Sequence, residues 1–172
     1  DIFGSMIQAV INPEVRSGMG VHYTSVPNIM KVIKPLFLDE LTEEYARIKD
    51  DVKKLRTLLI RLGKIKFFDP ACGSGSLLLQ VGRCVKVGHY YGNECNPTTY
   101  NLARMNMILH NIHYEQFDIR HTDTIADGGE NSSSWEEKYQ VQVANPPYSQ
   151  KWSASDKYMK DDRFSPYGKL AP

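Results

Sequence analysis

The sequence lacks several features that would assign it to a class directly. No stretch of its 172 residues approaches the roughly 20 consecutive apolar residues that a membrane-spanning helix needs. The opening residues lack the basic start and apolar run of a secretory signal peptide. The formal net charge is only +1, and no basic patch of the kind that usually marks a DNA-binding domain dominates the chain. We therefore expect a cytoplasmic location and no membrane partner.

Cysteine and histidine provide no disulfide or metal pattern. The three cysteines, Cys72, Cys84 and Cys95, form no CxxC pair, and such an odd, scattered set suggests neither a zinc cage nor a disulfide framework. Reduced thiols in a cytosolic protein are the plain interpretation. His110 and His113 stand three apart on a predicted helix, but no third ligand has a supporting spacing. We therefore predict no metal site.

Residues 1–63 are predicted to form a helical segment. Residues 2–11 are typical of a short apolar helix. Ser25 can cap a helix and Pro27 suits its first turn, so the next helix should begin there. Pro35 should bend or break that helix, because proline removes a backbone donor and clashes with the preceding turn.

Residues 41–62 carry a distinct pattern. Their apolar positions alternate spacings of four and three, which is an a/d stripe with charged residues in between. Two interpretations remain open: a partner-binding helix, or one amphipathic helix packed on its own domain. The stripe consists of Leu41, Tyr45, Ile48, Val52, Leu55, Leu59 and Leu62.

Residues 64–172 alternate apolar strands with helices. Strand–helix–strand repetition predicts a parallel, doubly wound α/β sheet. Ligands bind such sheets at the carboxyl ends of the strands, so functional residues are expected just after each strand. The expected strands cover 64–68, 89–93, 117–121 and 140–144, and the expected helices cover 76–87 and 98–110.

The strongest local pattern follows the first of these strands and reads FFDPACGSGSLL. Asp69 ends the strand, a glycine-rich turn follows, and a helix begins at Ser76. Glycines allow a positive φ and a close approach to a ligand, and the free N–H groups of the helix start favour a carboxylate or another anion. The spacing differs from the GxGxxG fingerprint of dinucleotide sites. The pattern predicts a ligand site of another class.

Polar residues also follow the later strands. Glu94 ends the second strand, where a carboxylate can accept both hydroxyl hydrogens of a ribose. Asp123 follows the third strand, which is a weaker signal because Asp is common in loops. The fourth strand leads into NPPY, residues 145–148. Each could be an ordinary turn or strand end, but together they predict one site at one edge of the sheet.

These motifs resemble those of the N6-adenine DNA methyltransferase family over nearly the whole chain. DPACGSG resembles the first cofactor motif of amino-methylating DNA methyltransferases, and GVHYT, residues 20–24, resembles their upstream motif. The resemblance implies a Rossmann-like class I S-adenosylmethionine-dependent methyltransferase fold, truncated here, behind the N-terminal helical segment. It also implies that the methionine end of the cofactor lies over the glycine turn, with Asp69 near its ammonium and Asp123 near its adenine amine. The implied cofactor residues are Tyr23, Thr24, Asp69, Ala71, Gly73, Ser74, Gly75, Glu94 and Asp123.

The chemistry of the Asn145, Pro146, Pro147 and Tyr148 motif suits an exocyclic aromatic amine. Such an amine is a poor nucleophile because its lone pair is delocalised into the ring. Two acceptors, the Asn145 side-chain oxygen and the Pro146 carbonyl, can draw the lone pair back, and proline holds them stiffly. Tyr148 can stack on a base extruded from the duplex. No metal and no covalent enzyme intermediate are required.

Two system types remain open. Residues 91–107 and 143–152 resemble the modification subunit of type I restriction–modification systems. This implies double-stranded DNA as substrate, a specificity subunit and a restriction subunit as partners, and a bacterial or archaeal cell. The long gap between Tyr23 and Asp69 instead resembles large single-chain enzymes that join methyltransferase, nuclease and specificity parts. Because the chain lacks an initiator Met and stops soon after NPPY, we expect a fragment that methylates DNA poorly alone.

Three other functions compete with this interpretation. Protein glutamine methyltransferases also use Asn-Pro-Pro-Tyr, but their glycine turn typically differs and they lack the Tyr-Thr motif. N4-cytosine methyltransferases usually place Ser where Asn145 stands. A non-catalytic scaffold could dock a partner through residues 41–62, and such a scaffold would have no need of S-adenosylmethionine.

Overall fold

The structure, a computed structural model, describes residues 26–126, 139–146 and 165–167. Within these ranges four parallel strands form one sheet in the order β3-β2-β1-β4. The strands are β1 (Lys66–Asp69), β2 (His89–Glu94), β3 (Phe117–His121) and β4 (Val141–Gln142). The predicted parallel α/β sheet is therefore confirmed, and the four expected strands lie within about two residues of their predicted positions.

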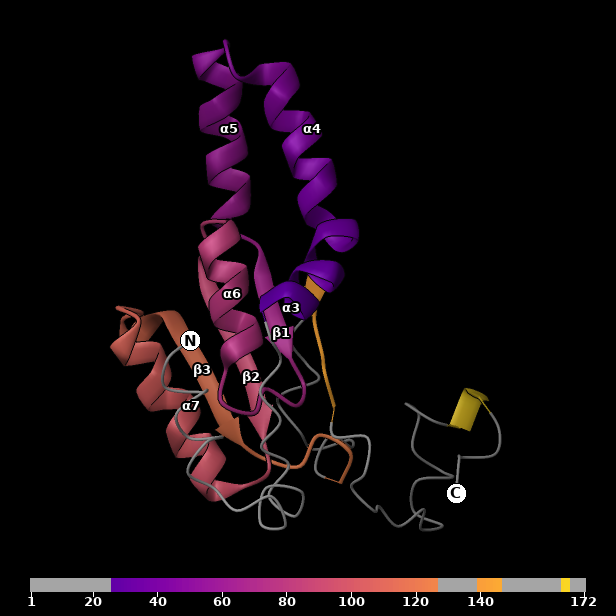
Figure 1. Ribbon diagram of the computed structural model, residues 1–172, viewed down its shortest axis with the longest axis vertical. Coiled ribbons are helices and arrows are strands. Elements are labelled where there is room, and N and C mark those ends of the chain that lie inside the picture. Colours follow the sequence, from indigo (N-terminus) through magenta and orange to yellow (C-terminus); the bar gives the residue numbers. More distant parts are fainter. Residues whose placement is uncertain (1–25, 127–138, 147–164, 168–172) are drawn as a thin grey trace.

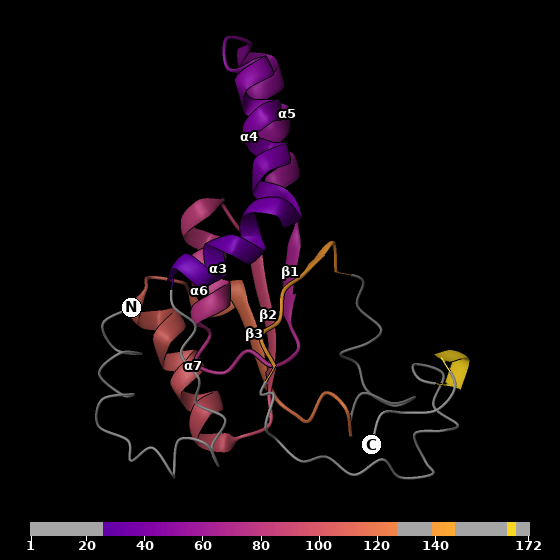
Figure 2. The same cartoon turned by 45° about the vertical axis from the view of Figure 1, so that its right-hand side comes forward.

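Helices cover one face of this sheet. In Figures 1 and 2, α3 (Val26–Ile33), α6 (Ser76–Cys84) and α7 (Pro97–Leu109) lie on the same side of the strands. The described residues also include two short 3-10 helices, η2 (Tyr114–Gln116) and η3 (Ser165–Tyr167). The fully buried core between helices and sheet includes Ile29, Ile33, Phe67, Leu78, Val81, Ala103 and Met107.

The two aromatic residues of β1 serve opposite faces of the sheet. Phe67 packs edge-on against Phe37, 5.4 Å between ring centroids, whereas Phe68 stacks on Tyr139 at 4.5 Å. Side chains alternate between the faces of a strand, so consecutive apolar residues indicate a strand buried on both sides. This burial holds β1 in the centre of the sheet, between β2 and β4.

The helix that begins at Val26 changes character at Pro35, as the sequence predicts. A π-helical stretch, η1 (Lys34–Leu38), follows α3 and leads into α4 (Asp39–Ile48). The Asp39 N–H donates to the Lys34 carbonyl, five residues back, so the proline interrupts the α-helical ladder without ending the helix. The helix axis turns between α3 and α4 (Figure 1).

The expectation of a single helix over residues 41–62 is wrong. The chain forms a helical hairpin of α4 and α5 (Val52–Leu62), which projects from the sheet (Figure 1). Asp51 causes the break, because its carboxylate accepts the N–H groups of Lys53 at 3.0 Å and Lys54 at 3.1 Å and so caps a new helix. An Arg61–Glu44 ion pair links the two helices.

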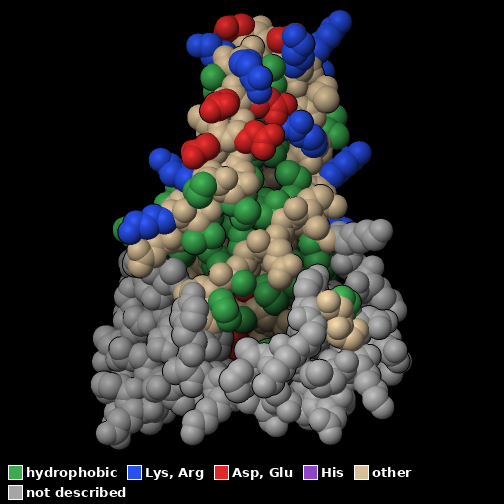
Figure 3. All heavy atoms as spheres, turned by 90° about the vertical axis from the view of Figure 1, so that its right-hand side faces the viewer, with side chains coloured by type: hydrophobic (Ala, Val, Ile, Leu, Met, Phe, Trp, Pro, Cys, Tyr) green, Lys and Arg blue, Asp and Glu red, His purple; other side chains and the backbone are tan. Residues whose placement is uncertain are grey.

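The predicted apolar stripe is not buried evenly along this hairpin. Four of its residues are half-buried, whereas Tyr45, Val52 and Leu59 are 54%, 66% and 55% exposed. Figure 3 shows charged side chains over the projecting hairpin and hydrophobic side chains gathered where it joins the sheet. The partner-binding interpretation of the stripe remains a prediction. The half-buried residues are Leu41, Ile48, Leu55 and Leu62.

Some expectations fall outside the described residues. The helix over residues 2–11, the Tyr23 and Thr24 pair, Pro147 and Tyr148 all belong to this group. No helix in the described ranges is long and apolar enough to span a membrane. The same ranges contain no cluster of three or more His, Cys, Asp or Glu side chains that could hold a metal ion.

Candidate active site

The turn between β1 and α6 adopts the conformation that its glycines permit. Gly73 has φ 55° and Gly75 has φ 79°, both in the left-handed region that other residues rarely occupy. Gly75 precedes the first residue of α6, and a Cβ there would lie 3.1 Å from the Met107 Cε. At Gly73 no described atom lies within 4 Å of the Cβ position. The turn therefore presents backbone with open space before it and a helix start directly behind it.

Asp69 lies directly beneath this turn and is 2% exposed. Its carboxylate accepts the Ala71 N–H at 3.0 Å. Burial, with a smaller contribution from the negative charge of Glu94, raises the pKa of Asp69 to about 7, against the lowering effect of that hydrogen bond. The described residues provide no ion-pair partner for Asp69. A buried carboxyl with this environment would be stabilised by a cationic group such as an ammonium.

Glu94 points toward the glycine turn from the end of β2. Its Oε2 accepts the Gly73 N–H at 3.0 Å, and its Oε1 accepts the Asn96 N–H at 2.8 Å. The Cys95 thiol also donates to Oε1, at 3.8 Å, and Oε2 keeps a second lone pair with which it can accept another hydrogen bond. The structure therefore brings Asp69, Gly73 and Glu94, predicted from separate motifs, into one group at the carboxyl edge of the sheet.

Asp123 reaches the same edge in a different role. It follows β3, which neighbours β2, and the Thr122 N–H donates to the Glu94 carbonyl at 3.2 Å. The Asp123 carboxylate is exposed and accepts the N–H groups of Ile125 at 2.9 Å and Ala126 at 3.0 Å. It thus caps its own turn. A contact of Asp123 with a cofactor remains a prediction.

The start of the NPPY motif follows β4, which is paired with the end of β1. The Val143 N–H donates to the Phe68 carbonyl at 2.9 Å, which extends the β1–β4 pairing beyond Gln142. Asn145 and Pro146 follow at the carboxyl edge, half-buried and exposed respectively. Parallel pairing of β4 with β1 therefore brings residues more than 70 positions apart in the sequence to one edge.

Cys72 belongs to the turn but is not suited to nucleophilic chemistry. Its thiol is buried, and this burial, followed by the negative charges of Asp69 and Glu94, raises its pKa well above the ordinary value. The thiolate is the reactive form of cysteine. Cys72 therefore stays a neutral thiol that packs under the turn.

Sequence reasoning missed three polar residues that support this edge. Asn106 donates to the Ser74 carbonyl at 3.0 Å, and Asn93 donates to the Thr124 hydroxyl at 3.1 Å. Asn93 and Asn106 are each 1% exposed. For Asn93 a signal existed, because a polar residue in a strand beside the acidic Glu94 must find partners if it is buried. For Thr124 the sequence contained no such signal.

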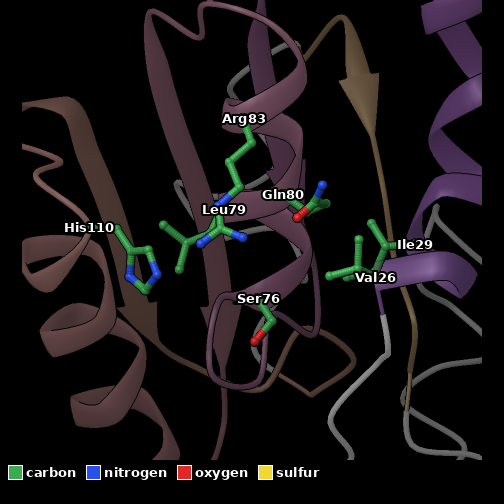
Figure 4. Close-up of a pocket in the computed structure, with 7 residues that line it drawn as sticks. All are labelled: Val26, Ile29, Ser76, Leu79, Gln80, Arg83 and His110. Atoms are coloured by element: carbon green, nitrogen blue, oxygen red, sulfur yellow. The ribbon is translucent and has the colours of Figure 1, made fainter. Parts of the chain in front are cut away.

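A shallow hollow elsewhere on the surface contains none of the predicted site residues. It lies between α3, α6 and the end of α7 (Figure 4). His110, at the end of α7, has its Nδ1 2.9 Å from the Asn106 carbonyl, as expected for an imidazole at a helix C-terminus. The lining residues are Val26, Ile29, Ser76, Leu79, Gln80, Arg83 and His110.

Comparison with known protein families gives one match over most of the chain. The sequence model of the family described as N-6 DNA Methylase matches residues 50–172. DNA methyltransferase A of Bacillus subtilis is 68% identical over 79 residues, which are 46% of this chain and 9% of that protein. The Type I restriction enzyme MpnII methylase subunit of Mycoplasma pneumoniae is 46% identical over 121 residues, 61% of this chain and 21% of that protein.

Solved structures that resemble this chain also belong to restriction–modification systems. The methyltransferase subunit of a type I restriction–modification system from Streptococcus thermophilus superposes with TM-score 0.57 and 45% identity, covering 63% of this chain and 23% of that chain. The Type IIL restriction-modification enzyme MmeI gives TM-score 0.55 at 24% identity, covering 73% and 23%, and shows likeness of fold alone. The predicted Rossmann-like methyltransferase fold is confirmed, and the chain spans less than a quarter of each of these proteins.

Proposed function

The chain belongs to the N-6 DNA methylase family, and we propose that it forms the cofactor-binding and catalytic core of an S-adenosylmethionine-dependent DNA (adenine-N6) methyltransferase. The observation that carries this proposal is the convergence of Asp69, Gly73, Glu94 and Asn145 at the carboxyl edge of one parallel sheet. In open α/β sheets this edge is where ligands bind.

The residues at this edge fit S-adenosylmethionine. The left-handed backbone of Gly73 faces open space just before α6, where free N–H groups of the helix start favour the carboxylate of an amino acid. Asp69 offers a buried carboxyl to the ammonium, and Glu94 offers lone pairs to ribose hydroxyls. Ala71, Ser74 and Asp123 complete the proposed cofactor residues within the described part of the chain, and Tyr23 and Thr24 complete them outside it.

The bound cofactor supplies a methyl group activated by a positively charged sulfur. Asn145 and the Pro146 carbonyl accept the two N–H hydrogens of the adenine amine and concentrate its lone pair on nitrogen. These two acceptors would aim the lone pair at the methyl group that the cofactor supplies, and the amine would release one proton to solvent. Tyr148 stacks on the extruded base and holds the amine in line. Asn145 acts most strongly in the transition state, when nitrogen changes hybridisation.

Double-stranded DNA is the proposed substrate, within a bacterial or archaeal restriction–modification system. The names of the Mycoplasma and Streptococcus relatives support a methyltransferase subunit of a type I system, and a specificity subunit and a restriction subunit are the partners that we propose for it. The alternative is the methyltransferase region of a single-chain enzyme. One comparison supports this alternative. The 79 matched residues, 68% identical, are only 9% of the Bacillus protein, so that protein is long enough to contain further domains.

The test measures where the methyl group goes. The complete protein is incubated with DNA and methyl-labelled S-adenosylmethionine, and the DNA is digested to nucleosides. We expect the label in N6-methyladenine. Label only in N4-methylcytosine, or only in a protein glutamine, would contradict the assignment.

A variant tests the mechanism separately. Asn145→Ala should reduce kcat by roughly 10²–10³-fold, the usual effect of removing a preorganised polar group, with cofactor affinity nearly unchanged. Asn101→Ala, a matched change at an exposed position on α7, should leave both unchanged. Normal turnover in the Asn145 variant would refute the catalytic role.

A further inference from the structure

A short chain of hydrogen bonds joins the segments that follow β1, β2 and β3. The Thr124 hydroxyl donates to the Pro70 carbonyl at 2.5 Å, and the Asn93 side-chain amide donates to the same hydroxyl at 3.1 Å. A hydroxyl has one hydrogen, so giving it to Pro70 leaves the oxygen to accept from Asn93. Asn93 is 1% exposed and Thr124 is half-buried, so water competes little for these bonds.

The backbone around Asn93 completes this connection. The Cys72 N–H donates to the Asn93 carbonyl at 2.9 Å, so the backbone of Asn93 bonds directly to the glycine turn, while its side chain is connected to Pro70 through the Thr124 hydroxyl. The Thr124 hydroxyl, in the turn that follows β3, bonds to the carbonyl of Pro70, which follows β1.

Thr124 lies inside the turn that Asp123 caps. Because the Asp123 carboxylate accepts the N–H groups of Ile125 and Ala126, residues 123–126 form a locally bonded unit. The bond from the Thr124 hydroxyl to the Pro70 carbonyl attaches that unit to the segment between β1 and the glycine turn. The Thr122 N–H already ties the start of this unit to the Glu94 carbonyl at 3.2 Å, and the Thr124 hydroxyl adds an attachment on the far side of Asp123, to Pro70.

We propose that Thr124 is a positioning residue for cofactor binding, which holds the adenine-facing Asp123 turn at the correct distance from the glycine turn. This inference rests on the proposed function, since it assumes that one cofactor spans both turns. It assigns no chemical step to Thr124. Asn145 and Pro146 are positioned by β4 pairing with β1, and the Thr124 hydroxyl has no part in that pairing.

Two substitutions at Thr124 separate the hydroxyl from the methyl group. Thr124→Val keeps the shape but removes the O–H, so the Asn93 amide and the Pro70 carbonyl lose their shared partner. We expect the dissociation constant and the KM for S-adenosylmethionine to rise about tenfold or more, with kcat at saturating cofactor within about twofold of wild type. Thr124→Ser keeps the hydroxyl and should bind within about threefold of wild type.

The experiment is isothermal titration calorimetry of the complete protein with S-adenosylmethionine, paired with initial rates on DNA. Thr57→Val is the matched control, because its hydroxyl bonds to the Lys53 carbonyl on the exposed hairpin. Asn93→Ala, which removes the donor but leaves the Thr124–Pro70 bond, should weaken binding by a smaller factor. It tests the same connection if Thr124→Val fails to fold.

The outcomes distinguish the inference from the function on which it rests. Equal affinity of wild type and Thr124→Val, or equal losses in the Val and Ser variants, overturns the positioning role. A fall in kcat with unchanged KM for the cofactor overturns it as well. Absence of S-adenosylmethionine binding by the wild-type protein overturns the proposed function itself.

Discussion

Replacing Asp69 by Asn should remove a specific pH dependence from the stability of the ligand-free protein. Asp69 is buried beneath the glycine turn, and its burial raises its pKa from 3.8 to about 7. The amide of Asn keeps an oxygen that can accept the Ala71 N–H, as the carboxylate does at 3.0 Å, but it never ionises. The variant therefore isolates the effect of charging one buried group.

The direction follows from the raised pKa. A group whose pKa is higher in the folded than in the unfolded protein stabilises the fold most below its unfolded pKa, and this contribution disappears as the pH rises through the folded value. A rise of about 3 units corresponds to at most roughly 4 kcal/mol. Between about pH 5 and pH 7.5, wild type should therefore lose roughly 2–3 kcal/mol relative to Asp69→Asn.

Hydrogen exchange of the amides in β1 and α6 measures this local stability in the complete protein. Asp50→Asn, at an exposed position in the turn of the hairpin, is the matched control and should follow wild type. Parallel pH profiles for wild type and Asp69→Asn would show that the Asp69 carboxyl does not change its ionisation between pH 5 and pH 7.5. That result would refute the reasoning from burial.

The same group links cofactor binding to pH. An ammonium placed beside Asp69 favours the carboxylate, so S-adenosylmethionine should bind wild type more tightly as the pH rises toward about 7, by at most tenfold per unit. In Asp69→Asn, binding should be weaker and nearly independent of pH over this range. If the affinity for S-adenosylmethionine changed with pH equally in wild type and Asp69→Asn, the ammonium would lie away from Asp69.

Two further predictions concern the site and the hairpin. Glu94→Ala should weaken S-adenosylmethionine binding by about 1.5–3 kcal/mol in calorimetry, because it removes a charge-assisted acceptor; unchanged affinity would exclude Glu94 from the pocket. Asp51→Ala should speed hydrogen exchange of the first amides of α5 severalfold, because the Lys53 and Lys54 N–H groups lose the carboxylate that accepts their hydrogen bonds. Asp51→Asn should keep this cap, because its amide oxygen can accept the same bonds. Equal exchange in Asp51→Ala and wild type would show that the cap does not hold the start of α5.

The strands could be predicted because their pattern is local. Paired aromatic residues in β1, followed at once by Asp69 and a glycine turn, indicate a doubly buried strand that ends at a ligand edge. The a/d stripe over residues 41–62 misled for a physical reason. Apolar periodicity continues in phase across the break, and only the Asp51 cap separates two helices from one. Tyr45, Val52 and Leu59 are exposed on the resulting hairpin.

The sequence by itself determined which chemical groups this protein carries and the order in which they follow its strands. The acidic residues, the glycine turn and the start of the NPPY motif are local strings, and each ends a recognisable strand. Such strings also indicate family, which the match over residues 50–172 confirms.

Only the tertiary structure decided how these groups meet. The order β3-β2-β1-β4 places Glu94 against Gly73 and brings Asn145 beside β1, although long stretches of chain separate them. Burial sets the ionisation of Asp69, and the Thr124 hydroxyl finds Pro70 across 54 positions of sequence. Burial and long-range hydrogen bonds depend on neighbours from distant segments, so no local pattern of residues encodes them.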